Sequence, residues 1–242
     1  MLNDRIQHYR ADAETFDYFH VDNPVLADEE RRRMQFLKTK LKFAPGSYVV
    51  DCGSGSGWLA REYLPLGVTV VSVDISDKNL RLIQSNYDPA GRGMYIVADL
   101  NHLPFKKGSL DGAVANDVYE HIEEPPVAAR EVYQSLKKGG CFYVSVPYKE
   151  KIIYYLCIHC NKPTPINAHL HSFDEQALTE IFVGAGFTIE KVYKFINKLF
   201  LATFVYYALC RWMPYRLWRA IDFTANLFIK KQSRIALKMV RN

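Results

Sequence analysis

The sequence lacks several features that define common classes of protein. Its five cysteines have no short, regular spacing across 242 residues, which argues against a secreted disulfide scaffold. No apolar stretch follows the initial Met-Leu-Asn-Asp-Arg, so we see no signal peptide and expect a reducing, cytoplasmic environment. A near-continuous apolar run, Leu199 to Cys210, would span about 18 Å as a helix, too short for a hydrocarbon core of about 30 Å.

Acidic residues are scarce at one end of the chain. From 194 to 242 there are ten Lys or Arg residues and a single acid, Asp222, whereas the preceding residues are acidic overall and the net charge is +5. This asymmetry indicates an anionic surface as a partner. The basic residues alternate with long apolar stretches instead of forming a polar patch, which argues against nucleic acid as that partner.

Three closely spaced glycines interrupt the strongest apolar pattern of the first half. A short run fit for a buried strand ends at Asp51, and Gly53, Gly55 and Gly57 follow before helical spacing resumes. A strand, glycine loop and helix in this order open a cofactor site at a helix N-terminus in α/β folds. The dinucleotide fingerprint G-x-G-x-x-G fits poorly, because its third glycine falls on Trp58. A carboxylate beside the loop suits a ligand with a cationic end.

The pattern D-x-G-x-G-x-G resembles motif I of class I S-adenosylmethionine-dependent methyltransferases, of the small-molecule, type 11-like group. That cofactor carries a sulfonium and an ammonium and no phosphate. The resemblance implies an α/β, Rossmann-like, doubly wound sheet of seven strands, the seventh antiparallel beside the sixth. It covers 46–195 and 232–242. It leaves 1–45 as a helical lead-in or lid, 148–171 as a Cys/His-containing insertion, and 196–231 as an amphipathic helical hairpin inserted between strands six and seven.

Acids follow three successive predicted strands, at Asp51, Asp74 and Asp99. An acid about 20 residues beyond a glycine loop is placed to bind ribose hydroxyls. Solvated strand ends are the alternative for each acid, but three in succession favour a site. By resemblance, Asp74 binds both hydroxyls and Asp99 lies near the adenine amino group. The expected S-adenosylmethionine-binding residues are Asp51, Gly53, Ser54, Gly55, Gly57, Asp74, Ile75, Asp99, Leu100 and Asn116.

Hydrophobic periodicity and capping residues predict the other elements. Ser76 is expected to cap a helix over 77–87, and Ser172 to Glu175 form a capping-box pattern before a helix that Gly184 and Gly186 end. Helices are also predicted over 28–37 and 125–136. Strands are predicted over 68–73, 94–98, 110–117, 141–146, 187–195 and 233–241.

The end of the fourth predicted strand carries candidate catalytic residues. It does not read N-P-P-Y, which disfavours the amino-methylating nucleic-acid enzymes with that signature. Asp117-x-x-Glu120-His121 resembles the E-x-x-E-H of ubiquinone-pathway O-methyltransferases, where these side chains hold a divalent ion; here Asp replaces the first Glu and has a shorter reach. We take Asp117, His121 and His169 as catalytic candidates. A hydrogen-bonded structural role is the alternative for His121.

Two cysteines and two histidines lie close together in the 148–171 insertion. Cys157, Cys160, His169 and His171 offer two thiolates and two imidazoles, a set suited to tetrahedral Zn²⁺. The spacing matches no standard finger, because H-x-H is tighter than H-x₃₋₅-H. In many relatives without the cysteines, a His shortly before an S-F-x-x-x-x-L helix start points into the substrate pocket. Zinc, a pocket histidine without metal, and neither role therefore stay open.

The predicted hairpin of 196–231 combines the apolar run with a second helix, Tyr215 to Lys231, beyond Pro214. One interpretation is a cap on the pocket or on a twin subunit. The other is a monotopic hairpin in the lipid interface, anchored by Trp212 and Trp218. The two expected faces of the second helix are Leu217, Trp218, Ile221, Ala225 and Phe228 on one side, and Arg216, Arg219, Asp222, Asn226 and Lys230 on the other.

These patterns together predict a methyltransferase that acts on a small lipophilic acceptor of quinone, isoprenoid or lipid type. We expect it at the cytoplasmic face of a membrane, with S-adenosylmethionine as cofactor and no nucleic acid as partner. One alternative is a cofactor-binding scaffold without turnover. Another is a soluble small-molecule methyltransferase in which the hairpin serves as a lid or a homodimer interface.

Overall fold

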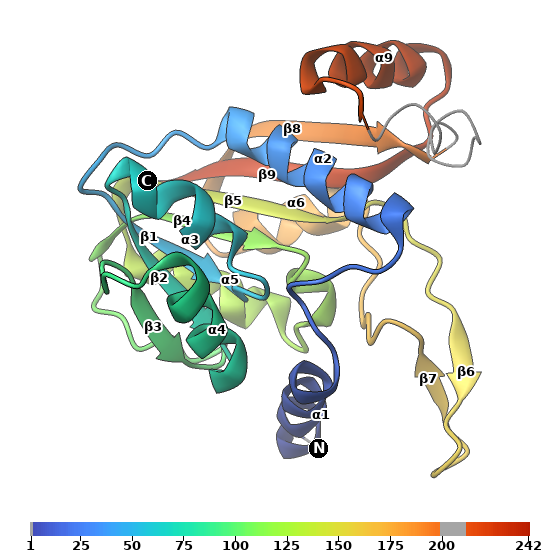
Figure 1. Ribbon diagram of the computed structural model, residues 1–242, viewed down its shortest axis with the longest axis horizontal. Helices are drawn as coiled ribbons and strands as arrows, with labels where there is room; N and C mark the ends of the chain where they lie inside the picture. Colours follow the sequence, from blue (N-terminus) through green and yellow to red (C-terminus); the bar gives the residue numbers. More distant parts are fainter. Residues whose placement is uncertain (1, 199–211) are drawn as a thin grey trace.

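The computed structural model describes residues 2–198 and 212–242 (Figure 1). Its strands are β1 Tyr48–Cys52, β2 Thr69–Asp74, β3 Met94–Val97, β4 Leu110–Asn116, β5 Leu136–Pro147, β6 Tyr154–Leu156, β7 Pro163–Pro165, β8 Phe187–Asn197 and β9 Gln232–Arg241. Seven of them form one sheet in the order β3-β2-β1-β4-β5-β9-β8, and β6 pairs with β7 separately. Strands β1 to β5 are parallel, and β9 is antiparallel to β5 and β8. The predicted doubly wound sheet is confirmed.

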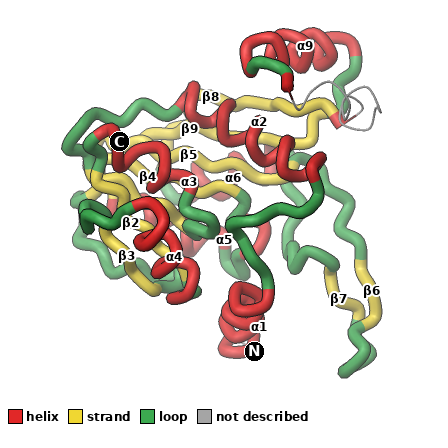
Figure 2. The backbone as a smooth tube through the Cα atoms, in the orientation of Figure 1, coloured by secondary structure: helices red, strands yellow, loops and turns green. Residues whose placement is uncertain are grey.

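The helices lie on both faces of this sheet (Figure 2). They are α1 Leu2–Thr15, α2 Pro24–Lys40, α3 Trp58–Tyr63, α4 Asp77–Tyr87, α5 Pro125–Ser135, α6 Glu175–Gly184 and α9 Tyr215–Phe228, with the 3₁₀ turns η1 Leu64–Leu66 and η2 Tyr119–His121. The central strands are buried on both faces, which explains why they read as continuous apolar runs. Strand β5 begins at Leu136, earlier than the predicted start at residue 141, because residues 137–140 lie within a shift of its register against β4.

Helix starts follow the capping residues. Ser76 accepts from the backbone N–H of Asn79, as predicted for α4. Helix α2 begins at Pro24 and not at Asp28. The side chain of Asn23 caps it, and proline at the first position has no N–H to satisfy. The acids predicted for its first turn therefore lie further along the helix.

The predicted capping box of α6 is wrong by two residues. Asp174 caps this helix and accepts from the backbone N–H of Ala177 at 2.9 Å. The Ser172 hydroxyl instead donates to the carbonyl of Glu150 at 2.6 Å and ties the helix start to the segment after β5. The S-x-x-E pattern is present, but Asp174 and not Ser172 caps the start of the helix.

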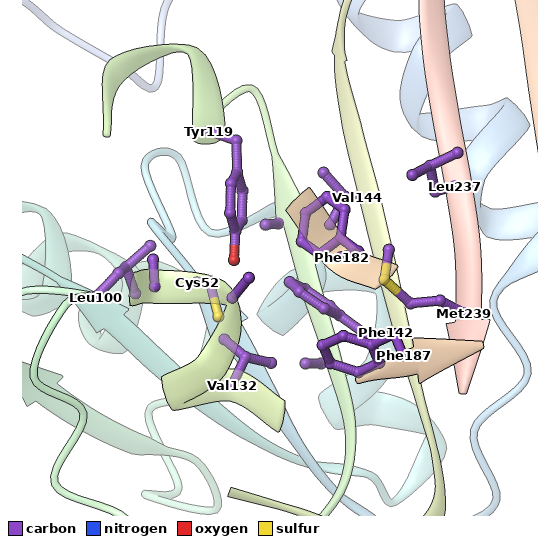
Figure 3. Close-up of a cluster of buried hydrophobic side chains, with 14 of the residues drawn as sticks. Cys52, Leu100, Tyr119, Val132, Phe142, Val144, Phe182, Phe187, Leu237 and Met239 are labelled. Atoms are coloured by element: carbon purple, nitrogen blue, oxygen red, sulfur yellow. The ribbon is translucent and has the colours of Figure 1, made fainter. Parts of the chain in front are cut away.

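Two hydrophobic cores fix the strand ends, one on each face of the sheet. Helices α5 and α6 cover the first core and helices α2, α3 and α4 cover the second. In the first core, Phe142, Phe182 and Phe187 pack with ring centroids 5.6 to 6.2 Å apart (Figure 3). Cys52 and Tyr119 reach the same cluster from the end of β1 and from η2. This packing holds in place the glycine loop after β1 and the residues Glu120 and His121, which follow Tyr119 in η2.

Helix α9 buries residues from both of its predicted faces. Asp222, expected on the polar outer side, is fully buried and accepts from the backbone N–H groups of Asn197 at 2.8 Å and Ile196 at 3.3 Å. Trp218 is buried beside it, with the Arg32 guanidinium 5.4 Å from its ring centroid. The residues left exposed on α9 and its flanks are Trp212, Leu217, Phe223, Leu227, Phe228 and Ile229.

The apolar run Leu199 to Cys210 lies outside the described residues. The first helix of the predicted hairpin is therefore untested, whereas α9 confirms a helix in the second half. Within residues 2–198 and 212–242, no helix combines the length and apolarity needed to cross a bilayer.

Replacement of Asp222 by Ala should lower the free energy of unfolding by about 2 to 4 kcal/mol, because two buried N–H groups lose their acceptor. Leu217→Ala on the exposed side of the same helix should cost less than about 0.5 kcal/mol. Urea unfolding of both variants measures the difference. Equal losses would contradict the observed orientation of α9.

Candidate functional site

The glycine loop after β1 is pinned to the neighbouring strand. The backbone N–H groups of Gly53 and Ser54 both donate to the carbonyl of Val73, at 2.8 and 3.0 Å. The buried hydroxyl of Ser54 lies within hydrogen-bond distance of the carbonyls of Asp51 and Val73. The side chain of Ser54 thus stabilises the loop, so a cofactor-binding role is left to its backbone.

The three glycines are required for different reasons. All have φ between +48° and +71°, a region that L side chains rarely adopt. A Cβ on Gly53 would meet Val118 at 2.7 Å, and one on Gly57 would meet Ile83 at 2.5 Å. A Cβ on Gly55 would meet nothing within 4 Å. Gly55 is therefore the point at which a ligand can approach the loop backbone.

Asp51 provides a buried carboxyl beside this loop. It is 1% exposed, and its Oδ2 has no hydrogen-bond partner among the described residues. Burial, followed by the nearby charge of Asp74, raises its pKa well above the usual value for aspartate. Asn116, at the end of β4, likewise has a buried Oδ1 without a partner in the part of the chain described. Unpaired buried oxygens are costly, and a cationic group of a ligand would satisfy them.

Asp74 and Asp99 lie at the same edge of the sheet. Asp74 accepts from the backbone N–H groups of Gly55 and Ser76, each at 2.9 Å, so it joins the glycine loop to the start of α4. Asp99 follows β3 and accepts from the backbone N–H of Asn101 at 2.9 Å. A carboxylate has about four lone-pair sites, which leaves both acids capacity for ligand hydroxyl or amino groups.

The remaining predicted cofactor residues lie on the same two strand ends. Ile75 directly follows Asp74, and its carbonyl accepts from the Arg10 guanidinium at 3.2 Å. Leu100 directly follows Asp99 and is 6% exposed. The ten residues predicted for S-adenosylmethionine therefore lie at or just beyond the ends of β1, β2, β3 and β4, and their oxygens fit a ligand with cationic and hydroxyl groups.

Helix α1 is anchored across this edge of the sheet. Its Tyr9 hydroxyl lies 3.2 Å from the carbonyls of both His121 and Ala168. Lys78 on α4 donates to the carbonyls of Ala13 and Glu14, at 3.0 and 2.9 Å, near its other end. These contacts agree with either predicted role of residues 1–45, a lead-in or a lid. Phe19, in the same segment, packs on the domain, with its ring 6.3 Å from that of Tyr87.

Asp117, predicted as a catalytic residue, lies in a cluster of ion pairs. Arg33 contacts one carboxylate oxygen, and the Arg234 guanidinium donates to the other at 2.9 Å. Arg234 also donates to Glu29 at 3.1 Å. Burial alone would raise the pKa of Asp117, but the two guanidinium groups outweigh it and lower that pKa. The carboxylate is committed to this ion cluster.

A second cluster contains the two histidines predicted as catalytic. Ligand atoms of Glu120, His121 and His169 all lie within 4.8 Å of one another, the one such group found in the described ranges. The ring centroids of His121 and His169 are 4.7 Å apart, and Glu150 contacts Nδ1 of His169. Burial, then the neighbouring His169, lowers the pKa of His121 to about 4. The group can accept a proton or hold a divalent cation.

Sequence reasoning missed Glu150, and it named Glu120 in the E-x-x-E-H resemblance without taking it as a catalytic candidate. Glu120 is 1% exposed, and neither carboxylate oxygen has a hydrogen-bond partner among the described residues. Burial, then Asp117, raises its pKa far above the usual glutamate value. The E-H pattern was a signal for Glu120. Nothing in the sequence pairs Glu150 with His169, because the loop between them brings the two together.

The predicted four-ligand zinc clip is not assembled, so this prediction is wrong for the described residues. His169 lies in the Glu120 cluster, and a ring nitrogen of His171 is 2.8 Å from the carbonyl of Ile122. Cys157 and Cys160 lie in the turn between β6 and β7, and neither belongs to that cluster.

Comparisons with known proteins agree with this geometry. The family model for the methyltransferase domain matches residues 50–144. The mitochondrial ubiquinone biosynthesis O-methyltransferase of Rattus norvegicus is 30% identical over 136 residues, covering 52% of this chain and 39% of that protein. A probable S-adenosylmethionine-dependent methyltransferase of Mycolicibacterium smegmatis is 26% identical over 171 residues, covering 69% and 63%. The chain thus spans less than two thirds of either relative.

Solved structures share the fold at low identity. An S-adenosylmethionine-dependent methyltransferase from Mesorhizobium loti matches with a TM-score of 0.65 at 20% identity, over 87% of this chain and 98% of that one. The chain therefore shares the fold of S-adenosylmethionine-dependent methyltransferases, and its central part, from β1 into β5, matches the methyltransferase domain family.

The depressed pKa of His121 predicts an acid-sensitive contribution to stability. Its pKa falls from 6.5 to about 4 on folding, so the folded state resists protonation that the unfolded chain accepts. The contribution of His121 to the free energy of unfolding is therefore greatest above about pH 6.5. It falls by about 3 kcal/mol as the pH is lowered to 4. We expect urea unfolding at both pH values to show that acid lowers the free energy of unfolding of His121→Gln by about 3 kcal/mol less than that of wild type. A pH-independent difference between the two proteins would contradict the assignment.

Proposed function

We propose that the protein transfers the methyl group of S-adenosylmethionine to a hydroxyl of a small lipophilic acceptor, of quinone, isoprenoid or lipid type, at a membrane surface. The main support is the buried Asp51 carboxyl, whose Oδ2 has no partner among the described residues and lies beside an open glycine. An ammonium group fits there, whereas a pyrophosphate would be repelled. When bound, the cofactor supplies an electrophilic methyl group on a sulfonium.

Different residues at the edge of the sheet bind different parts of that cofactor. Asp51 and Asn116 offer their free oxygens to the cationic end, and Asp74 accepts from ribose hydroxyls. Asp99 accepts from the adenine amino group. Backbone N–H groups and strand packing already hold these side chains in position, so the binding of the cofactor costs little side-chain conformational entropy.

His169 is the residue we assign to the proton of the acceptor hydroxyl. Glu150 contacts its Nδ1, so Nε2 is left to accept a proton, and the carboxylate stabilises the imidazolium that forms. His121, whose pKa is about 4, stays neutral and adds no competing positive charge. The unpaired Glu120 lies in the same group and is placed to orient the hydroxyl.

The exposed side of α9 supports a membrane location for the acceptor. Phe223 is 55% exposed and Phe228 83% exposed, a costly display of aromatic rings to water. Arg216, Lys230 and Lys231 are exposed on the same helix or directly after it. Apolar rings beside basic side chains suit an interface with anionic headgroups. Relatives of this chain are named for ubiquinone biosynthesis and for cycloartenol, and we propose an acceptor of comparable character.

Cofactor binding and methyl transfer are tested together. By calorimetry the wild type should bind S-adenosylhomocysteine, and Asp51→Asn should weaken binding roughly tenfold to a hundredfold, because a charge-assisted contact is lost. Asp77→Asn is the matched control, since Asp77 lies near the same edge but pairs with Arg81. With methyl-labelled cofactor and a membrane-lipid extract, His169→Gln should slow transfer at least about a hundredfold and leave binding unchanged.

The outcomes separate the alternatives. A wild type that does not bind the cofactor contradicts the whole proposal. A wild type that binds but labels no acceptor in any extract supports a scaffold. Equal transfer by His169→Gln and wild type contradicts the role of the histidine alone.

Flotation with liposomes tests the membrane role of α9. The wild type should float with vesicles containing anionic lipid, less so as salt rises, because both apolar burial and headgroup attraction contribute. Phe223→Ser with Phe228→Ser should abolish flotation, whereas Val183→Ser, a change at a similarly exposed residue of α6, should not. If the double variant floats as well as wild type, α9 is not the membrane contact.

A further inference from the structure

The β6–β7 hairpin projects from the domain (Figure 1), and most of its residues are exposed. Its two strands pair through three residues each, from Tyr154 opposite Pro165 to Leu156 opposite Pro163. Leu156 is 68% exposed and Ile158 is 88% exposed. A two-stranded hairpin with bare apolar side chains is marginally stable in water. A further contact must hold this segment.

The tip of the hairpin brings two thiols together. Cys157 donates its N–H to the carbonyl of Lys162 at 3.0 Å, and Asn161 donates to the carbonyl of Cys157 at 2.8 Å. Asn161 adopts φ +52°, which turns the chain back after Cys160. The backbone N–H groups of Cys160 and His159 and the thiol of Cys160 lie within hydrogen-bonding reach of the Cys157 sulfur.

This C-x₂-C turn has half the ligands of a structural zinc site. Such sites are tetrahedral and take four Cys or His ligands. His169 and His171, the partners expected from the sequence, are held by Glu150 and by the carbonyl of Ile122. No group of three or more potential ligands in the described parts of the chain includes either cysteine of the tip. Two further ligands must come from elsewhere.

We propose that Cys157 and Cys160 bind one Zn²⁺ together with the same two cysteines of a second copy of this chain. A tetrahedral site with two ligands from each side has two-fold symmetry, which is the symmetry of an isologous dimer. The same contact lets Leu156 and Ile158 pack on their counterparts. One interaction therefore accounts for the thiol pair and for the exposed apolar hairpin. It is independent of the proposed methyl transfer.

Elemental analysis and light scattering test this site. Protein purified without chelator, under a non-thiol reductant, should carry about one zinc per two chains and have twice the 27.9 kDa chain mass. Cys157→Ser with Cys160→Ser should release the zinc and give monomers. The thermal unfolding of the main domain should be retained, because the hairpin lies outside the seven-stranded sheet. Cys141→Ser, on β5, is the matched control and should keep both zinc and dimer.

Several results would overturn the proposal. A dimer in the double Ser variant would place the interface elsewhere. One zinc per chain in a monomer, lost on His169→Gln, would place the metal at the Glu120 cluster. Metal-free wild type, or a Cys157–Cys160 disulfide found by mass spectrometry in the reduced preparation, would exclude a zinc site at the tip.

Discussion

The ion cluster around Asp117 is the interaction on which the arrangement of the site depends. Arg33 comes from α2 and Arg234 from β9, and both contact the carboxylate at the end of β4. Asp117 also has φ +56°, so the chain turns sharply there into the segment that carries Glu120 and His121. A buried charge without partners would be strongly destabilising. The cluster therefore fixes three distant parts of the chain around one turn.

Two kinds of chemistry lie side by side at the edge of the sheet. The ends of β1, β2 and β3 present carboxyl groups with spare acceptor capacity. The turn η2, just beyond β4, presents His121 and Glu120, which is unpaired among the described residues, next to His169 from the segment after β7. The first set suits a cationic nucleoside ligand, and the second suits a proton leaving an acceptor. Helix α1 spans both through Tyr9 and Lys78. This proximity is what methyl transfer requires.

The sheet, the glycine loop and the acids at the strand ends could be predicted from the sequence, because each depends on the local spacing of residues. Asp51 and Asp74 follow apolar runs directly, so their place at strand ends needs no tertiary information. The burial of Asp222 on α9 was not predicted, because its carboxylate accepts from backbone N–H groups of β8, a contact that periodicity cannot anticipate. The four-ligand zinc site was predicted wrongly for a similar reason. His169 contacts Glu150 and His121, which come from other segments of the chain.

Hydrogen exchange with and without S-adenosylhomocysteine tests the central claim most directly, because it locates the ligand without assuming an acceptor. The account predicts slower exchange at the backbone amides of 52–57, 74–76, 99–101 and 116–118. It predicts no change in the β6–β7 hairpin or in α9. Protection confined to other parts of the chain, or no protection at saturating ligand, would contradict the assignment of the sheet edge as the cofactor site.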